Sequence, residues 1–126
     1  LQIEAAPVKF SDFEAADTSD SATIRKKVKN ARLIQLERYK DDKIFCNSQL
    51  TPAMMNRHCK LGKKEKLLIK EAFHRLKLSA RAYNKILKTA RTIADLEASD
   101  LIKERHLAEA IRYRNLDKYY NNVKNV

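Results

Sequence analysis

One long amphipathic pattern, at residues 78–99, restricts the fold of this chain more than any other feature of its sequence. Ser79 has the side chain of a helix N-cap, and the residues after it repeat with the 3.6-residue period of an α-helix. Six apolar residues form a stripe over about a third of the helix circumference: Tyr83, Ile86, Leu87, Ala90, Ile93 and Ala94. The pattern predicts a helix that lies along an apolar core.

The rest of the chain after residue 20 also has helical patterns. We expect helices over 22–40, 52–60, 64–76, 104–113 and 116–122, the first of them capped by Ser19 or Ser21. Thr51 and Pro52 are an N-cap followed by proline at the first helical position, and Gly62 is expected to be a left-handed cap after that helix. The sequence therefore predicts an all-α fold, a small bundle of four to six helices.

The first twenty residues differ from the rest. Residues 1–4 alternate apolar and polar side chains before Pro7, which is typical of a short edge strand, and residues 11–20 have the composition of an acidic linker. One strand cannot form a sheet, and the first residue is Leu1 rather than Met. We therefore expect a fragment of a longer, cytoplasmic protein without a membrane span, in which Cys46 and Cys59 are reduced.

The sequence contains no recognisable catalytic or metal-binding motif. The phosphate-binding loops need at least two glycines, and this chain of 126 residues has one. Cys46, Cys59 and His58 do not have the spacing of metal ligands, and the three histidines have no nearby nucleophile arrangement. We expect no bound cofactor, no metal and no enzyme activity in this chain alone.

The charge is strongly positive and unevenly distributed. The net charge is +11, yet residues 1–24 carry five acids against Lys9, so the basic residues belong to the helical part. On the helix at 78–99, three bases follow one another at i, i+4 and i+7 on the polar side. The candidate phosphate or DNA contacts are Arg81, Lys85 and Lys88, together with Lys26 and Lys29 on the helix at 22–40. A basic face that only meets solvent explains the same pattern equally well.

Residues 78–97, LSARAYNKILKTARTIADLE, followed by the HLAEAI string at 106–111, resemble the C-terminal domain of the magnesium-chelatase-like AAA+ ATPases, the family that includes the competence protein ComM. Residues 1–4, 35–38, 44–47 and 51–52 add to the resemblance. Departures are Asn84 and Lys85, where an Asp-Arg pair is usual, and Ala98, where glycine is expected. The tail after Asp117 has no counterpart.

The resemblance implies that this chain is one part of a longer protein, which has a separate ATPase core. Residues 1–20 would be the remnant strand and linker of an ATPase core that binds ATP and Mg²⁺, and residues 21–126 the helical lid. Arg81 matches the family's sensor-2 arginine, which reaches the γ-phosphate of ATP, and the helix at 22–40 is the candidate for the helix inserted between core and lid. The partners implied are the chain's own core and neighbouring subunits of a homo-oligomeric ring that acts on DNA by translocation and branch migration.

Two other functions fit the sequence. The first is a free-standing basic helical module that binds DNA without sequence preference, and the second is a domain used only for oligomerisation or partner docking. A G-x-x-x-x-G-K-[ST] motif upstream of this chain would favour the ATPase lid, and its absence would favour the free-standing module.

Overall fold

The computed structural model describes the backbone of residues 21–123 and the side chains of residues 21–113. Within these residues the chain forms five α-helices and one short 3₁₀ helix, and it contains no strand. The prediction of an all-α fold is therefore confirmed. The strand predicted at the N-terminus lies outside the described residues. No helix of the described part is long and apolar enough to span a bilayer.

The helices follow the predicted pattern closely, with one exception at the C-terminus. Their bounds are α1 (Ser21–Arg38), η2 (Asn47–Gln49), α2 (Pro52–His58), α3 (Lys63–Arg75), α4 (Ala80–Leu96) and α5 (Glu104–Val123). The two helices expected at 104–113 and 116–122 are one continuous helix, α5. That prediction was wrong because residues 113–116 contain neither glycine nor proline to end a helix.

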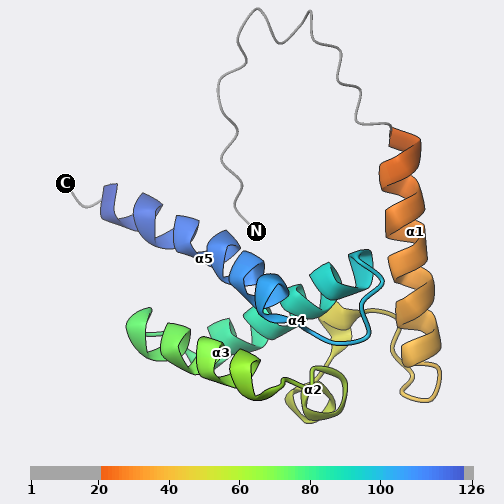
Figure 1. The fold of residues 1–126 in the computed structure, drawn as a ribbon, viewed down its shortest axis with the longest axis horizontal. Coiled ribbons are helices and arrows are strands. Elements are labelled where there is room, and N and C mark those ends of the chain that lie inside the picture. Colours follow the sequence, from red (N-terminus) through yellow and green to blue (C-terminus); the bar gives the residue numbers. More distant parts are fainter. Residues whose placement is uncertain (1–20, 124–126) are drawn as a thin grey trace, which may run out of the picture.

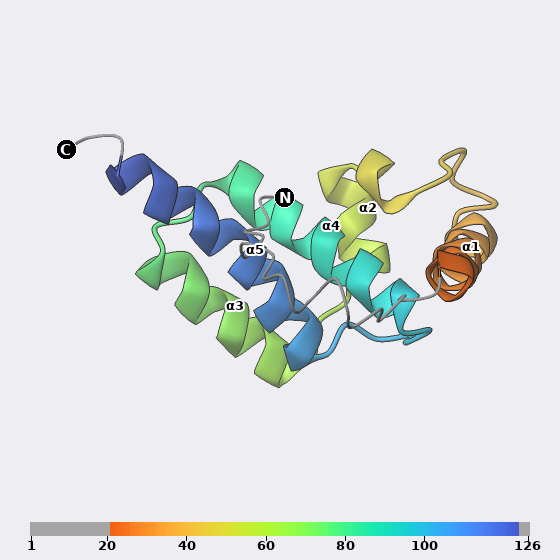
Figure 2. The same ribbon diagram turned by 90° about the horizontal axis from the view of Figure 1, so that it is seen from above.

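Helix α4 is the central element of the fold. Figures 1 and 2 show α5 lying against both α3 and α4, while α1 packs across the C-terminal end of α4. Helix α2 and η2 also contact α4. The apolar stripe predicted on this helix is confirmed, since five of its six residues are buried and Tyr83 packs partly buried against the core. A stripe of this width allows one helix to be covered from several sides.

Two of the predicted helix starts are confirmed at the level of hydrogen bonds. The Ser79 hydroxyl accepts a bond from the Ala82 N–H at 3.2 Å, and the Thr51 hydroxyl accepts one from the Met54 N–H at 3.4 Å. Pro52 occupies the first turn of α2, where its missing N–H leaves no bond unmade. Each side chain satisfies a donor that the helix itself leaves without a partner.

Gly62 does not have the left-handed conformation that we expected. It is the N-cap of α3, with a φ of −70°, so its backbone is in a region open to any residue. The left-handed helix ends in the described chain belong instead to Lys77 after α3 (φ 47°) and Ala98 after α4 (φ 51°). A short connection of four residues between α2 and α3 explains the error, because Gly62 belongs to the start of the next helix.

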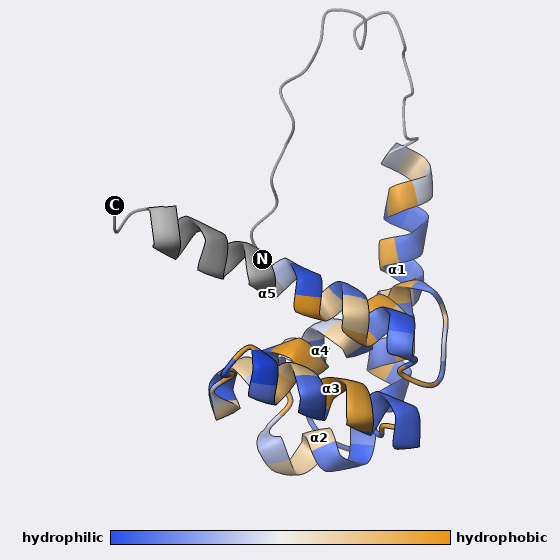
Figure 3. Ribbon diagram, turned by 60° about the vertical axis from the view of Figure 1, so that its left-hand side comes forward, coloured by the Kyte–Doolittle hydropathy of each residue, from blue (hydrophilic) through white to orange (hydrophobic). Residues whose placement is uncertain are grey.

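Helix α1 is packed over its C-terminal half only. Ala31 and Tyr39 are buried, but Ile24 and Val28, which the helical period places on the same side, are 52 % and 47 % exposed. All of residues 21–30 are exposed, and this half of the helix projects beyond the other helices (Figure 1). Both apolar and polar residues of the projecting half therefore lie on the surface (Figure 3).

Candidate functional site

Arg81 lies in the first turn of α4, immediately after the Ser79 cap. Its side chain is exposed, and within the described residues it has no hydrogen-bond or ion-pair partner. The first turn of a helix carries free N–H groups and the positive end of the helix dipole, both of which favour a nearby anion. The guanidinium is therefore free to meet a phosphate that approaches this end of α4.

The three candidate bases of α4 do not form a single exposed row. Lys85 is exposed one turn after Arg81, but the Lys88 ammonium donates a hydrogen bond to the Ser48 carbonyl at 2.8 Å. This bond connects α4 to η2, so Lys88 has a structural contact that the sequence did not indicate. Only the first two bases of the proposed row are open to an outside partner.

Lys26 and Lys29 lie on a different part of the molecule. They are exposed on the projecting half of α1, which packs at the opposite end of α4 from Arg81 (Figure 1). At 1.5 Å per residue, Arg81 and Asp95 are separated by about 21 Å along α4. The structure therefore does not bring the five candidate bases together at one site.

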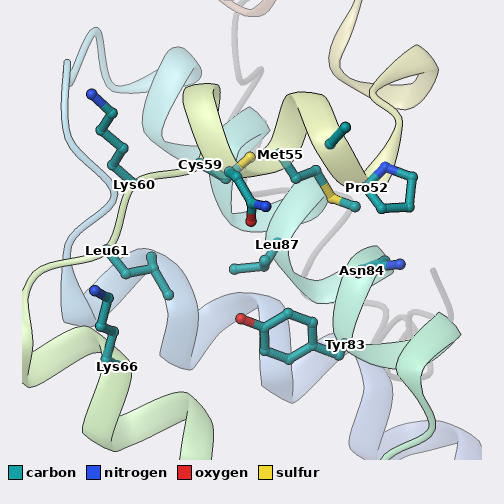
Figure 4. A pocket seen from close by; sticks show the side chains of 11 residues that line it. Pro52, Met55, Cys59, Lys60, Leu61, Lys66, Tyr83, Asn84 and Leu87 are labelled. Carbon is teal, nitrogen blue, oxygen red and sulfur yellow. The ribbon is translucent and has the colours of Figure 1, made fainter.

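A cavity of about 600 Å³ lies between α2, α3 and α4, next to the apolar stripe. Figure 4 shows Lys60 and Lys66 at its edge, with Leu61 and Leu87 among the apolar lining and Tyr83 beneath. Neither lysine has a carboxylate partner among the described side chains. Arg81 is not part of the lining, because it lies on another face of α4.

The most extensive polar arrangement in the described chain was not anticipated from the sequence. Asp95, whose side chain is fully buried on α4, accepts hydrogen bonds from three residues. Arg38 donates to its two oxygens at 2.9 and 2.5 Å, Asn47 donates from its amide at 2.8 Å, and Arg91 donates from Nε at 3.1 Å. These residues come from α1, η2 and α4, so one carboxylate joins three elements.

Arg91 makes further bonds that fix the chain after α4. Its remaining nitrogens donate to the carbonyls of Ser99 at 2.5 Å and Asp100 at 2.8 Å. Arg91 is 2 % exposed, so a buried charge is matched by one carboxylate and two carbonyl oxygens. In the described residues, no buried side-chain nitrogen or oxygen lacks a partner. We assign this network a structural role, because the Asp95 carboxylate and the Arg91 guanidinium at its centre are buried and bonded to each other.

A sequence signal for the network did exist. Arg91 and Asp95 are four residues apart, and each directly follows a residue of the apolar stripe, Ala90 and Ala94. Charged residues are almost never fully buried unless they are paired, so such a pair on a packed face indicates an internal salt bridge. The partners from α1 and η2 could not be identified from the sequence, because they lie 57 and 48 residues away from Asp95.

His106 is also a structural residue. It is completely buried, and its Nδ1 accepts a hydrogen bond from the Lys103 N–H at 3.0 Å. Its Nε2 therefore carries the proton and donates to Glu97 at 3.1 Å. The bonds from His106 and Arg105 lower the pKa of Glu97 below its ordinary value. The contacts join the end of α4 to the start of α5 and leave no free imidazole nitrogen for chemistry.

Within residues 21–113, no three His, Cys, Asp or Glu side chains come together as metal ligands. Cys46 and Cys59 are both free thiols. The described side chains thus offer cationic groups that can contact anions. Arg81 lies at the positive end of α4, and Lys63 and Lys64 lie at the positive end of α3.

Comparison with known proteins gives consistent matches over most of the chain. The model of the family described as magnesium chelatase, subunit ChlI C-terminal, matches residues 18–114. The competence protein ComM of Haemophilus influenzae is 40% identical over 106 residues, which are 84% of this chain and 20% of ComM. YifB of Escherichia coli, an uncharacterized protein, is 34% identical over 118 residues, which are 94% of this chain and 22% of YifB. The chain thus spans about a fifth of the length of these relatives.

Proposed function

Because the chain belongs to the family of the magnesium chelatase subunit ChlI C-terminal domain, we propose that it closes as a lid over ATP held by the core of an AAA+ ATPase. In this proposal Arg81 is the sensor-2 arginine, and the core that binds ATP and Mg²⁺ lies elsewhere in the parent protein. The observation that carries the proposal is the exposed, unpartnered guanidinium of Arg81 in the first turn of α4.

The role suits the chemistry of arginine. A guanidinium stays charged at all physiological pH values and offers a planar fork of donors to phosphate oxygens. Negative charge is distributed over the phosphoryl oxygens during transfer, and a fixed cation close to them lowers the barrier. Helix α4 is held at its other end by the Asp95 network, so Arg81 would be presented from a rigid element.

We propose further that the parent assembles as a homo-oligomeric ring in the cytoplasm and acts on DNA. The net charge of +11 supports an anionic partner such as DNA, and one of the relatives, ComM, is named a competence protein. The ring and the cytoplasmic location follow from the resemblance to the family. The second candidate function is a free-standing DNA-binding module. Unpartnered bases on α1 and α4 favour it, and the presence or absence of a phosphate-binding loop upstream separates the two.

Steady-state ATPase kinetics of the full-length parent test the role of Arg81. Arg81→Ala is expected to reduce turnover by roughly 10²- to 10³-fold, the loss typical of removing one donor aimed at transition-state charge. Lys85→Ala is the matched control, because Lys85 is exposed on the same helix one turn away. Lys88 is unsuitable as a control because it bonds to Ser48.

The control for folding is the stability of the present chain. Arg81→Ala is expected to change its free energy of unfolding by less than about 0.5 kcal/mol, since Arg81 is exposed and makes no hydrogen bond or ion pair within the described residues. Equal, small losses of turnover for Arg81→Ala and Lys85→Ala would refute the proposal. A large loss of stability would show that the arginine is structural.

A further inference from the structure

The projecting half of α1 carries a concentrated and unpaired positive charge. Residues 21–36 contain five bases and no acid, and the first carboxylate of the helix is that of Glu37. Four of the bases have no hydrogen-bond or ion-pair partner among the described side chains: Arg25, Lys26, Lys27 and Lys29. We call these four residues the basic arm. All of them are exposed, on a segment in which no residue is buried.

The composition of the basic arm is unfavourable for an isolated helix. Arg25 and Lys29 are four residues apart and Lys26 and Lys29 three apart, so both pairs place like charges next to each other. Each such pair costs about 0.2–0.5 kcal/mol. Helix α3, which is also rich in lysine, has Glu65 and Glu71 among its bases. Solubility alone does not require the omission of acids, but contact with a polyanion does favour it.

The geometry of the basic arm suits two rows of phosphates. Lys27 and Lys29 are two residues apart, so they point about 200° apart around the helix axis. Arg25 lies on the same side as Lys29. An α-helix with side chains is about 10–12 Å across and fits the major groove of duplex DNA, which is about 12 Å wide and bordered by a phosphate backbone on each side. Because this half of α1 projects from the other helices, it can approach a duplex without obstruction by them (Figure 1).

From these observations we propose that the basic arm is the surface through which this domain contacts the phosphate backbone of duplex DNA, without reading its bases. The proposal rests on the DNA-related part of the proposed function and is independent of the role of Arg81. The proposal assigns only some of the candidate phosphate contacts to DNA binding. Lys26 and Lys29 belong to the arm, together with Arg25 and Lys27, whereas Lys88 is bonded to Ser48 and lies outside it.

Fluorescence anisotropy with a fluorescein-labelled duplex of random sequence tests the proposal on this chain. The test variant is the triple substitution Lys26→Gln, Lys27→Gln and Lys29→Gln. The matched control removes the same charge from exposed, unpaired lysines of α3: Lys63→Gln, Lys64→Gln and Lys70→Gln. Circular dichroism verifies that each variant is folded. If a triple variant does not fold, the single substitutions Lys26→Gln and Lys63→Gln replace the two triples.

We expect the α1 variant to lose at least about tenfold in affinity at 100 mM NaCl. The slope of log K against log salt should become shallower by about 2 to 3, because each lost phosphate contact contributes roughly 0.9. The α3 variant should lose less than about threefold and keep the slope. Equal losses from both variants would overturn the proposal, because binding would then depend on net charge alone.

Two further outcomes would also overturn it. One is a wild-type affinity that does not change between about 50 and 200 mM NaCl. The other is arm-dependent binding to phosphatidylserine vesicles without binding to the duplex, which would indicate a membrane surface as the partner. ATP takes no part in this assay, so its result and that of the Arg81 kinetics can fail separately.

Discussion

Arg81 and Arg91 lie on the same helix but in opposite environments. Arg81 is exposed and has no partner within the described chain, whereas Arg91 is 2 % exposed and bonds to a carboxylate and two carbonyls. The C-terminal end of α4 uses its charges to hold three elements together, and the N-terminal end leaves its charges open. A charged residue that is bonded within the chain is therefore assigned a structural role. A charged residue that is exposed and without a partner remains a candidate for function.

The strongest test of this comparison is removal of the buried carboxylate. Asp95→Ala leaves the guanidiniums of Arg38 and Arg91 without their common counter-charge, in a site where both are largely buried. Breaking a buried pair in this way typically costs about 3–5 kcal/mol. We expect a loss of that size in the free energy of unfolding, measured by urea denaturation.

Glu71→Ala, on an exposed position of α3, serves as the control and should change stability by less than about 0.5 kcal/mol. If Asp95→Ala costs less than about 1 kcal/mol, the network is not what holds α1 on α4. The contrast between the two ends of the helix would then lose its energetic basis.

The two cysteines provide a second comparison, between a buried thiol and a partly exposed one. Burial raises the pKa of the Cys59 thiol to about 11 from an ordinary value of 9.0, while the Ser48 hydrogen bond lowers that of Cys46. Above pH 9 the unfolded chain loses the Cys59 proton but the folded chain retains it. Stability should therefore fall as pH rises from about 9 to about 11, by roughly 2–3 kcal/mol in total.

Urea denaturation across this pH range measures the effect, and Cys59→Ala isolates it from the titration of lysines and tyrosines. The variant should lose the extra decrease above pH 9. A disulfide-exchange reagent should modify Cys46, which is partly exposed, in the folded protein and Cys59 only after unfolding. Equal rates for the two thiols would contradict the burial of Cys59.

The smallest effect concerns the backbone at the end of α4. Ala98 has a φ of 51°, and the N–H groups of Ala98 and Ser99 donate to the carbonyls of Asp95 and Ala94, at 3.0 and 2.8 Å. This is a Schellman motif, in which glycine is preferred at the left-handed residue. Ala98→Gly should stabilise the chain by about 0.5–1 kcal/mol in thermal or urea unfolding.

Lys77→Gly, at the corresponding position after α3, should give a similar gain. Loss of stability in both variants would show that the left-handed conformation at these two helix ends is wrong. The structure thus explains why glycine is expected at position 98, and the alanine there is tolerated at a modest cost.

Local patterns in the sequence were sufficient to predict most of the fold. The stripe on α4 and the caps at Ser79 and Thr51 depend on neighbouring residues only, and all three are confirmed. Gly62 was misassigned because a glycine between two close helices can end one or begin the next. The break predicted in α5 was wrong because polar residues alone do not end a helix.

The candidate site could be predicted only in part. The position of Arg81 at the start of a helix followed from the sequence, and its exposure agrees with the role implied by the resemblance, which stays a prediction. The bond from Lys88 to Ser48 and the burial of Asp95 depend on residues distant in the chain. Helical periodicity gives the direction of a side chain, but it does not show what that side chain contacts.

The connection between α1 and α4 also has a consequence for synthesis of the chain. Arg38 leaves the ribosome 57 residues before the carboxylate that it binds. At elongation rates of about 5–20 residues per second, the finished α1 therefore waits roughly 3 to 11 seconds for its partner. During that interval Tyr39 and Ala31 have no core to enter, and a nascent basic helix is open to any nucleic acid or chaperone nearby.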